Sequence, residues 1–168
     1  MGPTDEQFTE FVHAAWRPLY RTAYLILGDH GTAEDLTQVA LAKTYASWRR
    51  VREVDAAVGY ARTVLHNEAK TMFRRTSWGR ERPTETLPDS AYEADPSVRP
   101  TVLDALRTLP PRQRAVVVLR FYEDLSVEQT AHALGCSAGT VKSQTSDALA
   151  KLRLLLGDIV SLEGANHD

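Results

Sequence analysis

The stretch SVEQTAHALGCSAGTVKSQTSDALAKLRLLL, residues 126–156, decides how the C-terminal part of this chain folds. Ser126 followed three positions later by Gln129 is a capping box, which predicts the start of a short helix. Gly135 lies where the chain leaves this helix, at a position that requires a positive φ, and Ser137 can cap the helix that follows. The stretch therefore predicts two helices joined by a tight turn.

The spacing of small and branched residues in this stretch is that of a helix-turn-helix. Ala131 is a small residue where the two helices would touch, Gly135 forms the turn, and Val141 is a branched apolar anchor in the second helix. Small residues at the start of the second helix let its backbone approach the floor of the DNA major groove, where polar side chains bond to phosphates and base edges. The expected DNA contacts are Ser137, Thr140, Lys142, Ser143, Gln144 and Asp147.

Two alternatives remain for these residues. The same pattern can form an ordinary helical hairpin whose polar face is only solvated, but the capping box, the glycine turn and the valine anchor together favour DNA binding. Asp147 can either repel phosphates or accept a hydrogen bond from cytosine N4. Cys136, in the turn, is interpreted as a small filler rather than a redox switch.

The composition limits the class of protein. The chain has 168 residues, of which 43% are hydrophobic and 25% are charged, and this suits one ordinary domain or two small ones. The longest apolar run, at 115–119, is far short of the roughly 18 residues that a membrane span needs, and the N-terminus lacks the features of a signal peptide. The single cysteine fits a reducing compartment, so we expect a cytoplasmic protein with no membrane contact of its own.

Catalytic and metal-binding patterns do not emerge from the sequence. The five histidines have no ligand spacing with cysteine or carboxylates, and no nucleophile is placed with a base. We therefore expect no metal, no cofactor and no enzymatic activity.

Hydrophobic periodicity predicts an all-α protein made of two small helical domains. The first domain, residues 1–82, should contain a helix over about 4–27, a second that Thr32 caps and that runs through Trp48, and a third that Asp55 caps and that runs to about residue 75. The apolar face of the second helix is expected to include Leu36, Val39, Ala40, the stem of Lys43, and residues 45–48.

The rest of the chain divides into a linker, a second domain and a tail. Residues 83–100 hold four prolines and several acids without a period, which predicts a flexible linker. The second domain, 101–157, should begin with a short helix that ends at Pro110, and Pro111 can be the first residue of a buried helix that reaches Tyr122. Residues 158–168 are expected to be a disordered tail.

Basic residues are concentrated in one part of a chain whose net charge is −2. Between Lys43 and Arg82 the sequence has ten basic and four acidic residues. Such arginines can simply be solvated or paired locally. Here, however, Arg62, Asn67 and further cations share one helix, and Trp78 follows it. This combination suits a single-stranded nucleic acid, with cations for the backbone, an amide for base edges and an aromatic ring for stacking.

Three blocks of the chain resemble a known family. The sequences GDHGTAEDLTQVALAKTYASW, residues 60–75, and LRTLPPRQRAVVVLRFYEDLSVEQTAHALGCSAGTVKSQTSDALAKLR together resemble bacterial ECF (extracytoplasmic-function) sigma factors, most closely their SigE-like actinobacterial branch. The resemblance covers most of the chain outside the linker and the tail, and its C-terminal block is the more specific part.

The resemblance implies a promoter-recognition subunit of RNA polymerase, with sigma regions 2 and 4 as its two domains. Core polymerase would bind through its β′ clamp helices and β flap, and the β′ contact would involve Asp35, Leu36 and Gln38. Region 2 would melt and hold the minus-ten element through Arg49, Arg50, Arg52, Arg62, Asn67, Lys70, Arg74 and Arg75. The helix after Ser137 would read the minus-thirty-five element of promoter DNA. Many members of the family also have an anti-sigma partner.

Two other functions compete with this hypothesis. A stand-alone helix-turn-helix transcriptional regulator would need an upstream sensing or receiver domain, normally with alternating strands and helices, and the N-terminal half has only helical periods. A helical adaptor without a nucleic-acid role leaves the cluster of basic residues unexplained.

Overall fold

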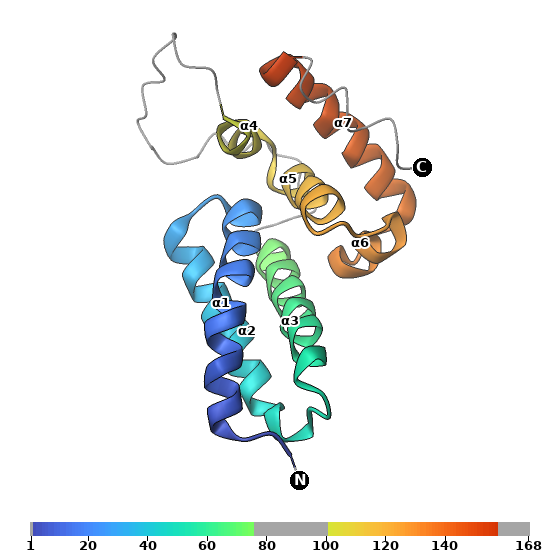
Figure 1. The fold of residues 1–168 in the computed structure, drawn as a ribbon. Coiled ribbons are helices and arrows are strands. Elements are labelled where there is room, and N and C mark those ends of the chain that lie inside the picture. Colours follow the sequence, from blue (N-terminus) through green and yellow to red (C-terminus); the bar gives the residue numbers. More distant parts are fainter. Residues whose placement is uncertain (1, 76–100, 158–168) are drawn as a thin grey trace.

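The computed structural model describes residues 2–75 and 101–157, and every regular element within these ranges is helical (Figure 1). The N-terminal unit contains α1 (Asp5–Leu27), α2 (His30–Ala46), the 3-10 turn η1 (Trp48–Arg50) and α3 (Val54–Arg75). The C-terminal unit contains α4 (Val102–Thr108), α5 (Pro111–Val117), the π-helical segment η2 (Val118–Tyr122), α6 (Val127–Leu134) and α7 (Ala138–Leu156). The expected all-α fold is confirmed.

Helix α1 has well-defined ends and one buried stripe. Thr4 and Gln7 form a capping box at its start, and Gly28, at φ 73°, terminates it in the left-handed conformation. The buried stripe consists of Phe11, Ala15, Leu19, Thr22, Ala23 and Ile26. At the lower end of the bundle the indole N–H of Trp48 donates to the carbonyl oxygen of Thr4 at 2.8 Å.

The start and the buried face of α2 differ from the prediction. Asp29, not Thr32, is the N-cap, because the Asp29 carboxylate accepts the Thr32 backbone N–H at 2.8 Å. The Thr32 hydroxyl also donates to this carboxylate. The two hydrogen bonds lower the pKa of Asp29, and the one from the hydroxyl has the larger effect. The predicted apolar face was partly wrong, since Val39 and Tyr45 are 39% and 49% exposed.

Two threonines take the place of those residues in the core. Thr37 and Thr44 are fully buried, and each hydroxyl donates to a carbonyl of its own helix, Ala33 at 2.7 Å and Ala40 at 2.8 Å. Because the hydroxyls are satisfied within the helix, their burial leaves no donor unpaired, and α2 can turn this face inward.

Two further boundaries were predicted only approximately. Helix α3 begins at Val54, so Asp55 lies in its first turn and is not its cap. The helix predicted after Pro111 does begin at Pro111, but it continues as a π-helical segment from Val118. By contrast, the capping box of Ser126 and Gln129, the positive φ of Gly135 (67°) and the cap at Ser137 are all confirmed.

The two units lie against each other. Helix α1 packs on α5 and η2, and α3 packs on α6 (Figure 1). Buried side chains of both units form one continuous apolar cluster. The expected linker at 83–100 and tail at 158–168, together with Trp78, Arg80 and Arg82, lie outside the described residues. Within the described ranges no helix is long and apolar enough to cross a membrane.

Candidate nucleic-acid interface

Polar and aromatic side chains form a stripe along α3. Tyr60, Thr63, Asn67, Lys70 and Arg74 follow one another at alternating steps of three and four residues, so they share one face of the helix. Tyr60 is 42% exposed. Tyr60 was not among the residues predicted to bind DNA, although its spacing of seven residues from Asn67 is a signal that places both side chains on one face of the helix.

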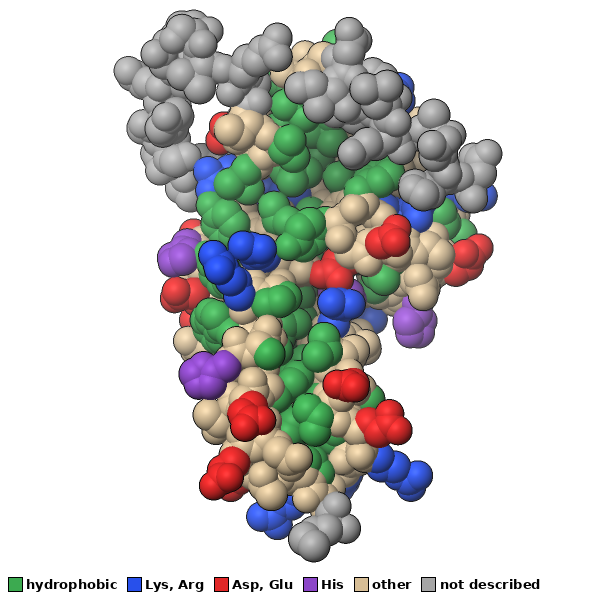
Figure 2. All heavy atoms as spheres, in the orientation of Figure 1, with side chains coloured by type: hydrophobic (Ala, Val, Ile, Leu, Met, Phe, Trp, Pro, Cys, Tyr) green, Lys and Arg blue, Asp and Glu red, His purple; other side chains and the backbone are tan. Residues whose placement is uncertain are grey.

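The stripe begins beside a hollow at the start of α3. The hollow has a volume of about 750 Å³ and lies between η1 and α3, where its lining includes Ser47, Arg50, Val51, Arg52 and Tyr60. The hydroxyls of Ser47 and Tyr60 are 3.1 Å apart. Figure 2 shows basic side chains at this end of the N-terminal unit. The hollow therefore combines an exposed aromatic ring with nearby cations.

The other predicted minus-ten residues fall into two groups. Most are exposed on η1, on the loop after it and on α3: Arg49, Arg50, Arg52, Asn67, Arg74 and Arg75. Arg62 and Lys70 are half-buried, on the side of α3 that faces the C-terminal unit. Arg62 Nε lies 3.0 Å from a carboxylate oxygen of Glu123, a partner that the sequence did not predict.

The helix-turn-helix presents the start of α7 to solvent. Ser137, Lys142, Ser143 and Asp147 are exposed, Thr140 and Gln144 are half-buried, and Val141 is fully buried as the anchor. The Ser137 hydroxyl accepts the Thr140 backbone N–H at 3.1 Å, which fixes the first turn of α7. The predicted contact residues therefore lie along the N-terminal half of α7.

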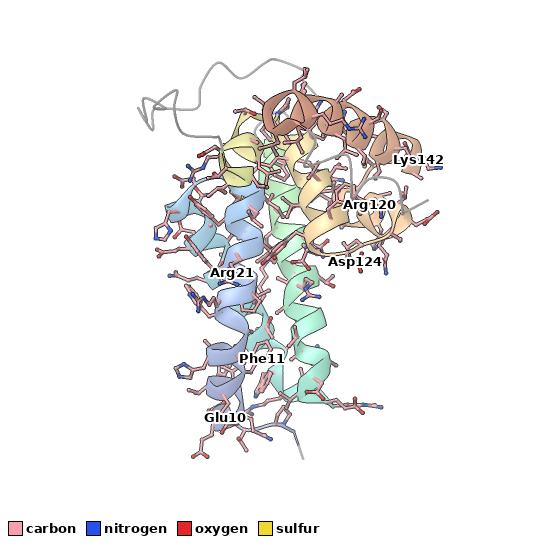
Figure 3. The ribbon with its side chains drawn as sticks, turned by 45° about the horizontal axis from the view of Figure 1, so that its top comes forward. Glu10, Phe11, Arg21, Arg120, Asp124 and Lys142 are labelled. Carbon is pink, nitrogen blue, oxygen red and sulfur yellow. The ribbon has the colours of Figure 1, made fainter. Side chains whose placement is uncertain are left out.

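A second hollow lies beside the start of α7. It has a volume of about 500 Å³, and its lining includes Arg120, Asp124, Gln129 and Lys142. In Figure 3, Arg120, Asp124 and Lys142 lie on the same side of the C-terminal unit. Arg120 Nη1 donates to the carbonyl oxygen of Leu125 at 2.6 Å, so this arginine holds the loop before α6. The sequence did not predict this role of Arg120, because no pattern around it indicates that its side chain turns back to the backbone of the following loop.

The three predicted polymerase-binding residues do not share one environment. Asp35 and Gln38 are exposed on α2, together with Val39. Leu36 is only 4% exposed, and its side chain belongs to the core of the N-terminal unit. Leu36 can therefore support the outer face of α2 but does not present its side chain there.

The described residues present two surfaces that suit nucleic-acid binding. No group of three or more His, Cys, Asp or Glu side chains within 2–75 and 101–157 could hold a metal ion. What the geometry does provide is a cationic and aromatic stripe on α3 and a polar helix start on α7.

The chain matches two family models and several characterised proteins. Residues 11–79 match Sigma-70 region 2, and residues 105–154 match Sigma-70, region 4. The RNA polymerase sigma-E factor of Streptomyces coelicolor is 42% identical over 155 residues, which cover 88% of this chain and 84% of that protein. The ECF RNA polymerase sigma factor SigL of Mycobacterium tuberculosis is 31% identical, with 88% and 86% covered.

A solved structure has a similar fold. It is the sigma factor RpoE of Bartonella quintana in complex with the anti-sigma factor NepR, with a TM-score of 0.60, 25% identity and coverage of 90% of this chain and 97% of that one. The sequence relatives and the two family models agree with the arrangement of α3 and the helix-turn-helix: the chain belongs to the sigma-70 family, the subunits that direct RNA polymerase to promoters, and to its ECF group.

Proposed function

We propose that this chain binds core RNA polymerase and recognises a promoter with both units, α3 with the η1 hollow at the minus-ten element and the start of α7 at the minus-thirty-five element. The observation that carries the proposal is the continuous stripe on α3, which leads from the hollow beside Tyr60 to the cations Lys70 and Arg74. This arrangement suits a separated DNA strand better than a duplex, because cations and aromatic rings bind the backbone and the bases of single strands.

At the minus-ten element the hollow would receive an unstacked base. Tyr60 would stack on it, while Arg50 and Arg52 neutralise the adjoining phosphates. Asn67, further along the stripe, would hydrogen-bond to the edge of another base. Strand separation would then be favoured because the separated strand gains these contacts and the duplex does not.

At the minus-thirty-five element α7 would enter the major groove by its N-terminal end. Ser137 and the free backbone amides of the first turn would bind phosphate, while Lys142 and Gln144 would bond to base edges. Asp147 keeps the two roles expected from the sequence, repulsion of phosphate or acceptance from cytosine N4. The chain would act by binding alone and would work in the cytoplasm.

Polymerase would be bound through the outer faces of both units. Asp35 and Gln38 on α2 are exposed and would contact the β′ clamp helices. Leu36 would support this contact indirectly, because its buried side chain packs α2 onto the core of the N-terminal unit. In the C-terminal unit, Leu154 and Val102 are 89% and 57% exposed, and these apolar side chains would meet the β flap. The Bartonella relative is in complex with an anti-sigma factor, and such a partner for this chain stays a prediction.

The proposal is tested by run-off transcription with core polymerase. Promoters are first found by mapping the transcripts that appear when the protein is overproduced. Tyr60→Ala and Asn67→Ala should reduce open-complex formation and leave binding to core polymerase unchanged. Thr71→Ala, on the same helix, is the matched control and should retain activity.

The two halves of the proposal have separate readouts. Lys142→Ala with Gln144→Ala should lower transcription from the complete promoter, and Lys151→Ala, further along α7, should not. Failure of the wild-type protein to bind core polymerase would refute the proposed function. Normal open complexes with both Tyr60→Ala and Asn67→Ala would refute the role of the α3 stripe.

A further inference from the structure

The short turn η1 has few hydrogen bonds of its own. The Arg50 N–H donates to the carbonyl oxygen of Ser47 at 2.9 Å. The Val51 N–H donates to that of Trp48 at 3.1 Å, and no side-chain hydrogen bond caps the turn. Because a three-residue 3-10 turn gains so little from within, packing against other segments must fix its position.

Trp48 joins this turn to the start of α1. Its indole N–H donates to the carbonyl oxygen of Thr4 at 2.8 Å, and the residue is 1% exposed. The ring centres of Phe8 and Phe11 lie 5.1 and 5.4 Å from that of Trp48. A hydrogen bond and burial among aromatic rings therefore hold the beginning of η1 against α1.

A second link joins α1 to the end of α2, directly before η1. The Tyr45 hydroxyl donates to the Asp5 carboxylate at 3.2 Å, and the ring centres of Tyr45 and Phe8 are 4.7 Å apart. Figure 1 shows the N-terminal end of α1 at the same end of the bundle as the connection between α2 and α3. The start of α1 thus braces the connection that carries the predicted minus-ten cations.

Gly2, which precedes α1, contacts the backbone of η1 directly. A Cβ added to Gly2 would lie 2.7 Å from the carbonyl oxygen of Arg49, 3.4 Å from its carbonyl carbon and 3.5 Å from its Cα. Non-bonded heavy atoms attract best at about 3.5–4.0 Å, so the first of these distances is a clash. The clashing atom belongs to the backbone and cannot rotate away as the end of a long side chain could. A residue without a side chain therefore lets this segment lie against the turn.

The carbonyl oxygen that Gly2 approaches belongs to the same rigid unit as Arg50. The peptide bond is planar, so the carbonyl group of Arg49 moves together with the N and Cα atoms of Arg50. Arg50 in turn lines the hollow that also includes Tyr60, whose hydroxyl is 3.1 Å from that of Ser47. The contact of Gly2 is thus coupled to the direction of Arg50 at the hollow.

From these contacts we infer that Gly2 is a positioning residue for the minus-ten site: by lying against the Arg49 carbonyl it sets the direction in which Arg50 meets DNA. The inference rests on the proposed function for the role of Arg50 in DNA binding, and on the contacts alone for the position of η1. A side chain at position 2 would either rotate this peptide or lift residues 2–4 away from the turn. In both cases Arg50 loses its fixed direction, while the exposed faces of α2 and α7 are unchanged.

The role of Gly2 is tested with holoenzyme formed from core polymerase and the full chain. Gly2→Ala should shorten the lifetime of open complexes on a mapped promoter about threefold to tenfold, the size of coupling expected for residues in contact. The concentration of sigma protein needed to bind core polymerase should not change. Gly31→Ala is the matched control, because a Cβ there would lie 3.7 Å from Asp29, an ordinary contact. An unchanged lifetime for Gly2→Ala would overturn the inference.

A double-mutant cycle separates the positioning of Arg50 from a general loss of stability. In an Arg50→Ala protein, Gly2→Ala should have a further effect below about 1.5-fold, because the side chain that it misdirects is absent. In a Lys142→Ala protein, which is altered at the other promoter element, the effect of Gly2→Ala should be complete. A complete effect in the Arg50→Ala protein would contradict the inference and indicate a purely structural role.

The contact itself is tested in the free full chain by proton–nitrogen NMR. Gly2→Ala should shift the backbone amide signal of Arg50 and the indole signal of Trp48, and should leave the amide signal of Lys142 in place. Unshifted Arg50 and Trp48 signals would overturn the inference even if the wild type transcribes normally, and the proposed function would stand. The expected shifts, without any binding of the wild type to core polymerase, would sustain the positioning of η1 and refute the proposed function.

Discussion

The guanidinium of Arg114 donates to the carbonyl oxygen of Ile26 at 2.7 Å, and these residues are 88 positions apart in the chain. Arg114 Nη1 would also lie 3.3 Å from a Cβ added to Gly28, the residue that ends α1. The C-terminal end of α1 is therefore stabilised by a side chain of the other unit, and the absence of a side chain at Gly28 makes room for it.

Replacement of Arg114 by Met should destabilise the whole chain. The carbonyl oxygens of Ile26 and Leu27 lose their partner, and a buried polar group left unpaired costs about 1–3 kcal/mol. Urea unfolding followed by circular dichroism should show this loss in the free energy of unfolding. Arg153→Met, at an exposed position of α7, is the control, with an expected change within about 0.5 kcal/mol. Equal effects of the two changes would show that the buried contact contributes nothing.

Two glycine-to-alanine changes should have opposite signs. Gly28 has φ 73°, so alanine there should cost about 1–2 kcal/mol and also press on Arg114. Gly59 lies within α3, and a Cβ there would meet nothing within 4 Å, so alanine should stabilise the protein by about 0.5–1 kcal/mol. The thermal midpoint should therefore fall for Gly28→Ala and rise for Gly59→Ala. A lower midpoint for Gly59→Ala would contradict the open space around this position.

The features predicted correctly from the sequence are those that depend on nearby residues. The capping box at the start of α6, formed by Ser126 and Gln129, and the turn at Gly135 involve only groups within a few positions of one another. The start of α7 is likewise set by its N-cap, Ser137. The fold class and the helix-turn-helix could be predicted for this reason. The start of α2 was misassigned because Asp29 and Thr32 are both residue types that cap helices, and the sequence alone did not show that the Asp29 carboxylate accepts the Thr32 backbone N–H.

The features that were missed depend on residues far apart. Thr37 and Thr44 look like surface residues in the sequence, yet their internal hydrogen bonds let α2 bury them. Glu123 and Arg114 look like solvated charges, and only the docking of α5 and η2 on α1 gives them partners. Periodicity describes each helix by itself, so it cannot predict which charges meet across the boundary between the units.

Replacement of Thr130 by valine should stabilise the folded protein. It is fully buried in α6, and its hydroxyl has no hydrogen-bond partner. Since valine has nearly the same shape without the buried hydroxyl, Thr130→Val should raise the free energy of unfolding by about 1 kcal/mol. Thr37→Val is the matched comparison, because the Thr37 hydroxyl does donate to Ala33. A gain at position 37 as large as at position 130 would disprove this explanation.

Acidification should destabilise the folded chain through His66. This side chain is 7% exposed, and its Nε2 is buried without a partner. Burial lowers the pKa of His66; the nearby Glu123 carboxylate raises it and Arg62 lowers it. The neutral ring is thus favoured in the folded state, so its stabilising contribution is complete above the unfolded pKa of about 6.5 and is lost as the pH falls through the lower folded pKa.

The measurement compares urea midpoints at about pH 8 and about pH 5.5, on either side of the ordinary histidine pKa. The wild type should lose more stability than His66→Leu, which has no proton to bind at this position. His132→Gln, at an exposed site on α6, should retain the full loss. If His66→Leu is as sensitive to acid as the wild type, the buried imidazole is not the group responsible.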